Sequence, residues 1–325
     1  MAGAKTLRRP SKANSLDLPA PNMTHTPTTP SPVIQCVPNF SEGRSRATLD
    51  AIVDSARAAS TARIIDYSLD PDHNRAVVTL LGAPGEIRDA VLAAAHKAIE
   101  TIDLRHHDGE HPRIGAVDVI PLVPIAGITL QECAEIACEI GQELSHRLDL
   151  PIYFYEHSAR CEHRANLPDV RRGGFERLCE LGMTGDRAPD CGPSAPHPSA
   201  GATVVGARNP LIAYNVNLRT TDLEIAREIV RSIRSGEADL TGVRSIAVWL
   251  ASRSLVQVST NITRPDLSSI QQVFTYVSEQ AEKLGVAVAE SEIIGAIRRR
   301  HLDGATPERI KAVSFKEEQI IDNWL

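Results

Sequence analysis

The strongest constraint on the fold of this chain is an alternation of strand and helix patterns that occurs twice. From residue 33 the segments read strand, helix, strand, strand, helix, strand, and the same order returns from residue 211. Helically spaced apolar residues, short β runs and turn-rich breaks define the segments. The expected elements of the first copy are 33–37, 47–59, 63–67, 75–81, a helix from 84, and 114–124; those of the second are 211–217, 222–234, 243–250, 255–260, 268–284 and 286–289.

This order is the split βαβ, or ferredoxin-like, pattern. We therefore predict an α/β (α+β) protein with two ferredoxin-like βαββαβ subdomains and a ligand cleft between them. A further helix (130–148) and strand (151–155) follow the first copy. The predicted boundaries are 33–180 for the N-terminal subdomain, 181–206 for a linker that contributes to a binding site, and 207–325 for the C-terminal subdomain.

The first 32 residues differ in composition from the rest of the chain. They are rich in Pro, Ser, Thr and Ala, and they lack the apolar core of a secretory signal. Such a composition cannot bury enough apolar surface to fold, so 1–32 is predicted to be a disordered N-terminal tail. A transit peptide and a true start at Met23 are the alternatives.

Charge and cysteine content narrow the class of protein. The formal net charge of −6 leaves no global basic surface for nucleic acid. No apolar run is long enough to span a bilayer, so no membrane partner is expected. The six cysteines form no CxxC pair and no disulfide framework, which indicates a reducing, cytoplasmic location. An anionic ligand would have to meet a local group of arginines.

The segment 105–113, Arg-His-His-Asp-Gly-Glu-His-Pro-Arg, is the densest group of titratable residues. It precedes an apolar stretch that reads as a buried strand, and histidines near a rigid strand suit proton transfer near neutral pH. A solvated loop would explain the charges but not three histidines. A metal site is the other alternative, but Gly109 and Pro112 make it improbable that His107 and His111 share a helix face.

Several segments, in order along the chain, resemble those of one known family, the formiminotransferase domain of glutamate formimidoyltransferase and of formiminotransferase-cyclodeaminase. The resemblance spans about residues 33–295. The segments that carry it are Val37-Pro-Asn-Phe-Ser-Glu-Gly-Arg44, Asn74-Arg75, Gly109-Glu-His-Pro-Arg-Ile-Gly-Ala-Val-Asp-Val119, Gly192-Pro-Ser194, Gly201-Ala-Thr-Val-Val-Gly-Ala-Arg208, Ala213-Tyr-Asn-Val-Asn-Leu218 and Gln257-Val-Ser-Thr-Asn261.

This resemblance implies a one-carbon transferase. The family moves the formimidoyl group of N-formimidoyl-L-glutamate to N5 of tetrahydrofolate, giving 5-formimidoyltetrahydrofolate and L-glutamate, in histidine degradation. It implies tetrahydrofolate or its polyglutamate as co-substrate, no metal, and a homodimer. The family's proton acceptor corresponds to His111, and Glu110 or Asp118 is expected to assist it. The folate-binding positions it implies are Gly192, Pro193, Ser194, Gly201, Val243, Arg244 and Ser245.

The two carboxylates of glutamate call for arginines and amide donors. Arg44, Arg75 and Arg113, with Asn39 and Asn74, are the candidate substrate-binding residues. Arg171, Arg172 and Arg208 are weaker candidates for the folate tail. The animal domain has an acid aligned with Ser68, for which Asp70 or Asp72 is the candidate replacement here.

Three alternatives to the formimidoyltransferase stay open at this point. A close variant would use a formyl donor such as N-formylglutamate. A metal-dependent hydrolase of a formimidoyl- or formyl-amino acid would use His106, His107 and His111. A non-catalytic folate-binding paralogue would bind folate without turnover.

Overall fold

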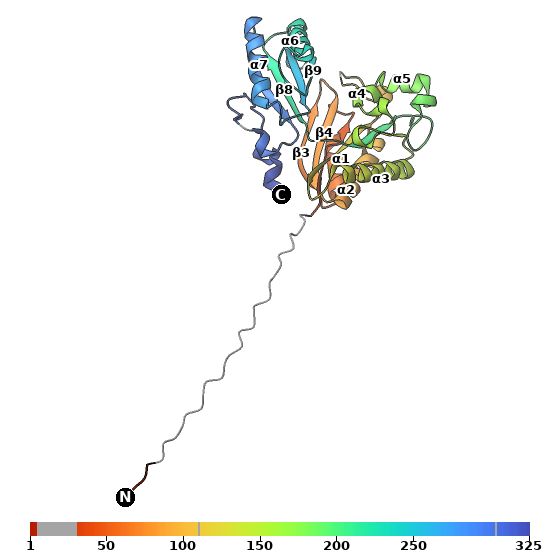
Figure 1. The fold of residues 1–325 in the computed structure, drawn as a ribbon. Coiled ribbons are helices and arrows are strands. Elements are labelled where there is room, and N and C mark those ends of the chain that lie inside the picture. Colours follow the sequence, from red (N-terminus) through yellow and green to blue (C-terminus); the bar gives the residue numbers. More distant parts are fainter. Residues whose placement is uncertain (5–30, 110, 303) are drawn as a thin grey trace. The chain divides into compact units, whose positions relative to one another are not determined.

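The structure is a computed structural model that describes residues 1–4, 31–109, 111–302 and 304–325. Contacts divide the chain into two units, 1–30 and 31–325. The larger unit holds the helices and strands of the described residues (Figure 1). Of the predicted tail 1–32, residues 5–30 lie outside the described residues. No described helix has both the length and the apolar content needed to cross a membrane.

The first copy of the pattern forms an antiparallel sheet with helices packed against it. Strand β1 spans Val33–Cys36, and β2, Asn39–Phe40, continues along the same two neighbours, β4 and β5. The lateral order is β3, β4, then β1 with β2, then β5, which confirms the ferredoxin-like topology. The remaining elements are α1 (Arg46–Ala59), β3 (Arg63–Asp70), β4 (Arg75–Gly82), α2 (Pro84–Thr101) and β5 (Val117–Ala126).

Two parallel strands extend this sheet beyond β5. Helix α3 (Leu130–Leu148) leads to β6 (Ile152–Phe154), and β7 (Thr203–Ala207) pairs in parallel with both β5 and β6. The expected linker 181–206 therefore contains most of a strand of the first sheet. Strand β7 is fully buried, which is typical of a parallel strand with an unbroken run of small and apolar residues. Because the run does not alternate between apolar and polar residues, the sequence pattern did not predict this strand. Between β6 and β7 lie α4 (Leu167–Val170) and α5 (Gly174–Leu181).

The second copy forms a four-stranded antiparallel sheet in the order β11, β8, β10, β9. This is the same topology as in the first copy. Tyr214, Val216 and Leu218 of β8 point into a core with the apolar faces of α6 and α7. The elements are β8 (Ile212–Leu218), α6 (Leu223–Ser235), β9 (Val243–Leu250), β10 (Leu255–Ile262), α7 (Ile270–Lys283) and β11 (Val288–Ile294), the last of which runs beyond the expected 286–289.

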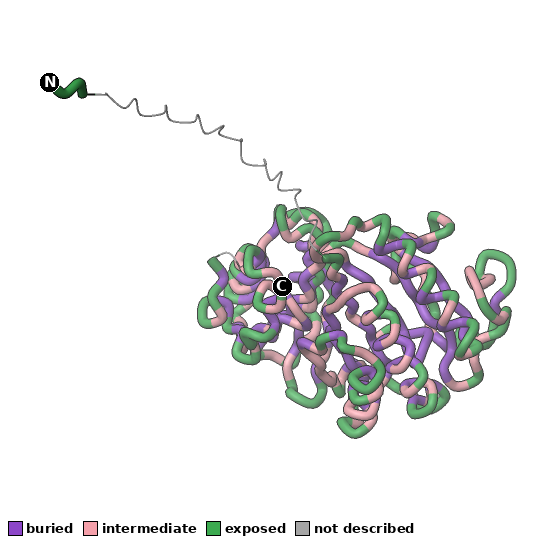
Figure 2. The backbone as a smooth tube through the Cα atoms, turned by 90° about the horizontal axis from the view of Figure 1, so that it is seen from below, coloured by how far each residue is buried: buried purple, intermediate pink, exposed green. Residues whose placement is uncertain are grey.

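The C-terminal segment attaches the second copy to β3 and β4 of the first. Ile321 packs in one apolar cluster with Ile65 and Leu81, and Arg63 donates a hydrogen bond to the Trp324 carbonyl at 3.0 Å. These contacts involve the short 3₁₀ turns Glu317–Gln319 and Ile321–Trp324. Figure 2 shows buried residues concentrated in the interior of this unit. The polar residues described next lie where the two copies meet.

Candidate active site

The turn between β3 and β4 fixes the loops around the site. Asn74 adopts a left-handed backbone with φ 47°, which asparagine tolerates better than most residues. Its side chain accepts from the Gly43 amide at 2.8 Å and donates to the Asp108 carbonyl at 2.8 Å. Both ends of the expected substrate-binding amide of Asn74 are thus occupied by backbone groups. It joins the turn to the Gly43 loop and to the loop that carries His111.

Glycine is required at position 43 by this close packing. A Cβ there would lie 2.1 Å from the Asp70 carbonyl oxygen and 2.3 Å from the Arg75 nitrogen. Both obstacles are backbone atoms that cannot move aside as a side-chain end can. The Gly43 loop therefore presses directly onto the turn that positions Arg75.

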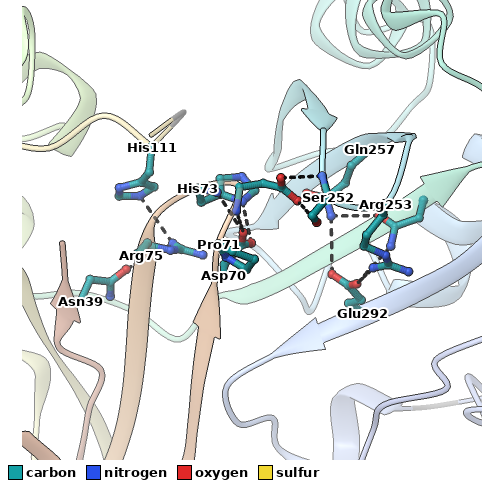
Figure 3. A network of polar contacts seen from close by, with 12 residues as sticks. Asn39, Asp70, Pro71, His73, Arg75, His111, Ser252, Arg253, Gln257 and Glu292 are labelled. Carbon is teal, nitrogen blue, oxygen red and sulfur yellow. Dashed lines mark hydrogen bonds and ion pairs between the residues drawn. The ribbon is translucent and has the colours of Figure 1, made fainter. Parts of the chain in front are cut away.

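His111 lies beside Arg75, the first residue of β4 (Figure 3). The distance from Arg75 Nη1 to His111 Nε2 is 3.5 Å, and the same Nη1 donates to Asn39 Oδ1 at 3.2 Å. Asn39 is held in turn by its own donation to the Val37 carbonyl at 2.9 Å. Three residues predicted from the sequence, from β2, β4 and the α2–β5 loop, are therefore brought together.

The surroundings keep the His111 ring neutral. Burial, followed by the positive charges of Arg75 and Arg171, holds the pKa of His111 well below its usual value of about 6.5. Burial also lowers the pKa of Arg75 to about 10, so Arg75 stays charged at neutral pH. A neutral imidazole next to a fixed cation can accept a proton but does not carry one at rest.

A second histidine on the same turn is paired with a carboxylate. His73 Nδ1 lies 2.6 Å from Asp70 Oδ2, and His73 is 6% exposed. Burial tends to raise the pKa of Asp70, but the hydrogen bond and charge of His73 outweigh it and lower that pKa. Asp70 is therefore an ionised carboxylate close to Arg75. Sequence analysis did not single out His73, although the run Asp-Pro-Asp-His-Asn contained the signal.

Asp72, the other candidate for the missing acid, is bound to the second copy. Its carboxylate accepts from the Ser252 amide at 3.0 Å and from the Ser252 hydroxyl at 2.6 Å. Ser252 lies in the turn between β9 and β10. Asp72 thus joins the two copies, and Figure 3 shows Ser252 on the side of Asp70 and His73.

Two other arginines predicted from the sequence, Arg113 and Arg171, form ion pairs near His111. Arg113 Nη2 contacts Glu176 Oε1 at 2.7 Å and donates to the His107 carbonyl at 2.9 Å. Arg171, at the end of α4, forms an ion pair with Asp118. Both pairs place a buried guanidinium at the site.

Asp118 is one of the two carboxylates that the sequence offers as an assistant to His111. It is 1% exposed, and its other oxygen accepts from the Ile114 amide at 2.8 Å. Among the described residues, its side chain therefore anchors Arg171 and the backbone just before β5, and it makes no hydrogen bond to the His111 ring. The sequence suggested Arg171 only for the folate tail. Its positive charge nevertheless acts on His111, and Asp118 holds it in place through the ion pair. The pair Arg171-Arg172 before two glycines was its only sequence signal.

The remaining catalytic and substrate-binding candidates have lesser contacts. Glu110 lies outside the described residues. Arg44 is exposed, and its Nε lies 3.4 Å from the Pro71 carbonyl. His107 Nε2 is 2.8 Å from the Asn74 carbonyl, and burial lowers the pKa of His107.

The expected folate-binding positions fall into two groups. Gly201 has φ 69°, and a Cβ there would lie 2.1 Å from the Ile114 carbonyl, so the 192–201 segment ends against the strand that follows His111. Gly192, with φ 93°, packs instead on Leu150. Val243, Arg244 and Ser245 open β9 in the second sheet, and Arg244 reaches Asn166 Oδ1 at 3.4 Å. Asn166 precedes α4, whose C-terminal end bears Arg171.

Within the described ranges, which omit Glu110 and Asp303, no three His, Cys, Asp or Glu side chains are grouped for a metal ion. His107 Nε2 is already directed at the Asn74 carbonyl, and His106 is exposed.

Comparison with known families matches both copies. The formiminotransferase domain, N-terminal subdomain, matches residues 33–208, and the formiminotransferase domain matches residues 213–321. The chain belongs to the formiminotransferase family. The first match includes β7, in agreement with the place of that strand in the first sheet.

Individual members of the family cover most of the chain. A glutamate formimidoyltransferase of Streptococcus pyogenes is 40% identical over 90% of this chain and 98% of its own length. One from Thermoplasma acidophilum is 37% identical over 89% of this chain and 96% of its own length. The formimidoyltransferase-cyclodeaminase of Sus scrofa is 38% identical over 82% of this chain but only 50% of its own length.

Proposed function

We propose that this protein is a glutamate formimidoyltransferase that transfers the formimidoyl group from N-formimidoyl-L-glutamate to N5 of tetrahydrofolate. The observation that carries the proposal is the His111 ring 3.5 Å from Arg75, in a chain of this family, where burial and nearby cations lower the His111 pKa. Full-length similarity to formimidoyltransferases at 37–40% identity supports the same reaction.

The reaction needs one group that accepts a proton and later donates it. Attack of the folate N5 amine on the amidine carbon gives a tetrahedral adduct in which N5 must lose a proton. The nitrogen of the departing glutamate must then gain one. Neutral His111 accepts the first proton and, as imidazolium, donates it to the leaving nitrogen. The low pKa of His111 favours this second step because the imidazolium is a strong acid.

Charges around His111 fit a donor with two carboxylates and one cationic amidine. Guanidinium groups bind carboxylates through charge-assisted and often bidentate hydrogen bonds, so Arg75, Arg113 and Arg171 are suited to the glutamate part. Asp70, an ionised carboxylate near Arg75, is suited to the amidinium. No oxyanion forms at this carbon, so a nearby carboxylate helps more than an oxyanion hole.

The co-substrate would lie where the two copies meet. Arg244 reaches from β9 to the residue before α4, and Gly201 packs against Ile114 beside the His111 loop. These contacts support a folate site formed by Gly192, Pro193, Ser194 and Gly201 from one copy and Val243, Arg244 and Ser245 from the other. No metal is required by this chemistry.

The wider setting is also part of the proposal. All six cysteines are free, which supports a reducing cytoplasm. A role in histidine degradation and a homodimeric state follow from the resemblance alone. Light scattering of the purified protein tests the dimer, since a mass near 35 kDa would contradict it.

The direct test is a transfer assay with N-formimidoyl-L-glutamate and tetrahydrofolate, with and without a chelator. Tetrahydrofolate-dependent release of glutamate that is unaffected by the chelator is the expected result. Release without folate that the chelator abolishes would indicate the hydrolase instead. Turnover of N-formylglutamate but not of the formimidoyl compound would establish the formyl variant. Folate binding without turnover of either donor would leave the binding paralogue.

A further inference from the structure

A cluster of amides and carboxylates covers the face of the second sheet that points away from α6 and α7. Tyr214 and Val216 of β8 are buried against those helices, so Asn215 and Asn217, which alternate with them, leave the opposite face. Asn217 pairs across the sheet with Gln257 of β10 and with Glu290 of β11. These three side chains therefore form one row across three strands.

The hydrogen bonds of the cluster run in one direction. Asn217 Nδ2 donates to Glu290 Oε1 at 3.3 Å and to Glu292 Oε1 at 3.1 Å. Ionised carboxylates only accept, so the Asn217 amide cannot be turned around. Its oxygen accepts from Gln257 Nε2 at 2.9 Å, which fixes the Gln257 amide in turn. The Gln257 oxygen therefore takes no part in these hydrogen bonds.

One acceptor in the cluster is buried without a partner, and a second has only a marginal one. Gln257 is 1% exposed, and its Oε1 has no hydrogen-bond partner among the described residues. Glu292 Oε2 has, within the same residues, only the Gln257 Nε2 contact at 3.5 Å, at the limit for a hydrogen bond. A buried acceptor without a partner is costly, and native proteins rarely leave one. The side chain of Glu292 is 21% exposed, so the cluster opens at that residue.

Charge decides what kind of ligand such a site can take. Among the described residues, Glu290 and Glu292 share one counter-ion, Arg253, which contacts both carboxylates. A carboxylate ligand would be repelled here, whereas the arginines around His111 attract one. Gln257 Oε1 has no donor among the described residues, and Glu292 Oε2 has only the marginal one, so the pair can accept two hydrogen bonds from one ligand edge.

The cluster adjoins the candidate active site. Ser252 and Arg253 belong to the β9–β10 turn, and Asp72 of the β3–β4 turn binds Ser252 at 2.6 Å. Figure 3 shows Glu292 and Gln257 in the same polar network as His73 and Arg75. The acceptor pair on the second copy is therefore connected, through these two turns, to the part of the first copy that carries Arg75 and His111.

We propose that Gln257 and Glu292 bind a planar N–C–N donor edge of a substrate and thereby contribute to substrate specificity. This rests on the proposed function, in which both reactants carry such an edge: the formamidinium of the donor, and the 2-amino group with N3–H of the reduced pterin. Asn217 is a positioning residue, because its oxygen accepts from Gln257 Nε2 and thereby fixes the orientation of the Gln257 amide.

The test measures binding of N-formimidoyl-L-glutamate and of tetrahydrofolate separately, by anaerobic titration calorimetry, to wild type, Glu292→Gln and Gln257→Met. Each variant is expected to weaken binding of one of the two ligands about ten-fold or more, with the other unaffected. Loss on the formimidoyl compound identifies the formamidinium, and loss on tetrahydrofolate identifies the pterin edge. A KM increase for the same ligand with little change in kcat is the matching kinetic result.

Glu290→Gln is the matched control. Glu290 lies on the same face of β11, also binds Arg253 and Asn217, and has a similar exposed fraction of 23%. It makes no contact with Gln257 in the described hydrogen bonds, so its variant should bind both ligands within about threefold of wild type. Equal weakening by Glu290→Gln would overturn the proposal, because the acidic pair would then act only through Arg253.

Further outcomes keep the proposal separate from the proposed function. Unchanged affinity for both ligands in folded Glu292→Gln and Gln257→Met would overturn it, and if Glu292→Gln fails to fold, Gln257→Met alone decides. Wild-type protein that binds either ligand, loses that binding in the variants and yet transfers no group would refute the proposed function and leave the ligand edge established. Wild-type protein that binds neither ligand would refute both.

Discussion

The two halves of the molecule share one topology but use it differently. In the first sheet, residues 102–116 separate α2 from β5 and carry His111, while in the second only residues 284–287 separate α7 from β11. The polar face of the second sheet instead carries its functional candidates on the strands themselves, at Asn217, Gln257 and Glu292. A duplicated scaffold can thus place the proposed base on a loop of one copy and the proposed acceptors on the strands of the other.

The two hairpin turns at corresponding positions of the halves also differ in what they contribute. Residues 71–74 connect β3 to β4, residues 251–254 connect β9 to β10, and each turn ends in a left-handed residue, Asn74 with φ 47° and Ser254 with φ 52°. The two turns meet through Asp72 and Ser252. The first turn leads to the cation next to His111, and the second supplies Arg253 to the acidic pair.

The largest expected effect comes from removing the base on the first copy. His111→Ala should lower kcat by about 10²–10⁴-fold with little change in folate affinity, since general acid–base catalysis contributes that much. Steady-state kinetics and equilibrium binding measure the two quantities. His96→Ala, an exposed histidine on α2, is the control and should retain wild-type activity. Equal activity in the two variants would remove His111 from the mechanism.

Arg75→Met should have a smaller effect of two kinds. Loss of the cation raises the pKa of His111, so the acidic limb of the kcat/KM profile moves to higher pH. Loss of a charged hydrogen bond should also weaken binding of the formimidoyl donor, roughly 10–150-fold. The pH–rate profile and the donor KM check these effects. A profile that stays in place would show that Arg75 does not control the ring.

The pH dependence of stability tests the same region without activity. The pKa of His111 and of His107 is lowered on folding, so the folded state binds fewer protons than the unfolded state. Their contribution to stability is full above about pH 6.5 and is lost as pH falls through the folded-state pKa. Urea unfolding at pH 7.5 and 5.5 should therefore show lower stability at pH 5.5, and His111→Gln should reduce the difference. An undiminished difference in His111→Gln would contradict the assignment.

The smallest expected effect concerns the contact between the two turns. Asp72→Ala removes both acceptors of Ser252 and should lower the free energy of unfolding by about 0.5–1.5 kcal/mol, toward the lower value because Ser252 is exposed. Thermal unfolding measures this change. Ser252→Ala retains the backbone bond and should cost less. A larger loss for Ser252→Ala than for Asp72→Ala would show that another interaction dominates.

Local patterns predicted the repeated topology because each element carries its own periodicity. Helix α1, for example, buries Leu49, Ile52, Val53 and Ala56 at helical spacing, and Ser45 caps it. Strand β7 was not predicted, because a strand buried on both faces shows no alternation of apolar and polar residues. Its partner β5 also lies far away in the sequence.

Sequence reasoning predicted which residues lie together more readily than it predicted their contacts. It identified His111, Arg75 and Asn39 from a motif, yet it could not foresee that Asn74 would be used by two backbone groups. Asp118 pairs with Arg171 across 53 positions of the chain, and no local pattern encodes such a pairing. Long-range polar partners depend on tertiary packing, which spacing alone does not reveal.

The most direct test of the account is an NMR titration of His111 in the full chain, with the signal assigned by comparison with His111→Gln. A neutral ring held beside Arg75 predicts a midpoint clearly below pH 6.5, and the midpoint should move upward in Arg75→Met. A midpoint at or above pH 6.5 in the wild-type protein would mean that His111 is largely protonated near neutrality, and it would contradict His111 as the proton acceptor.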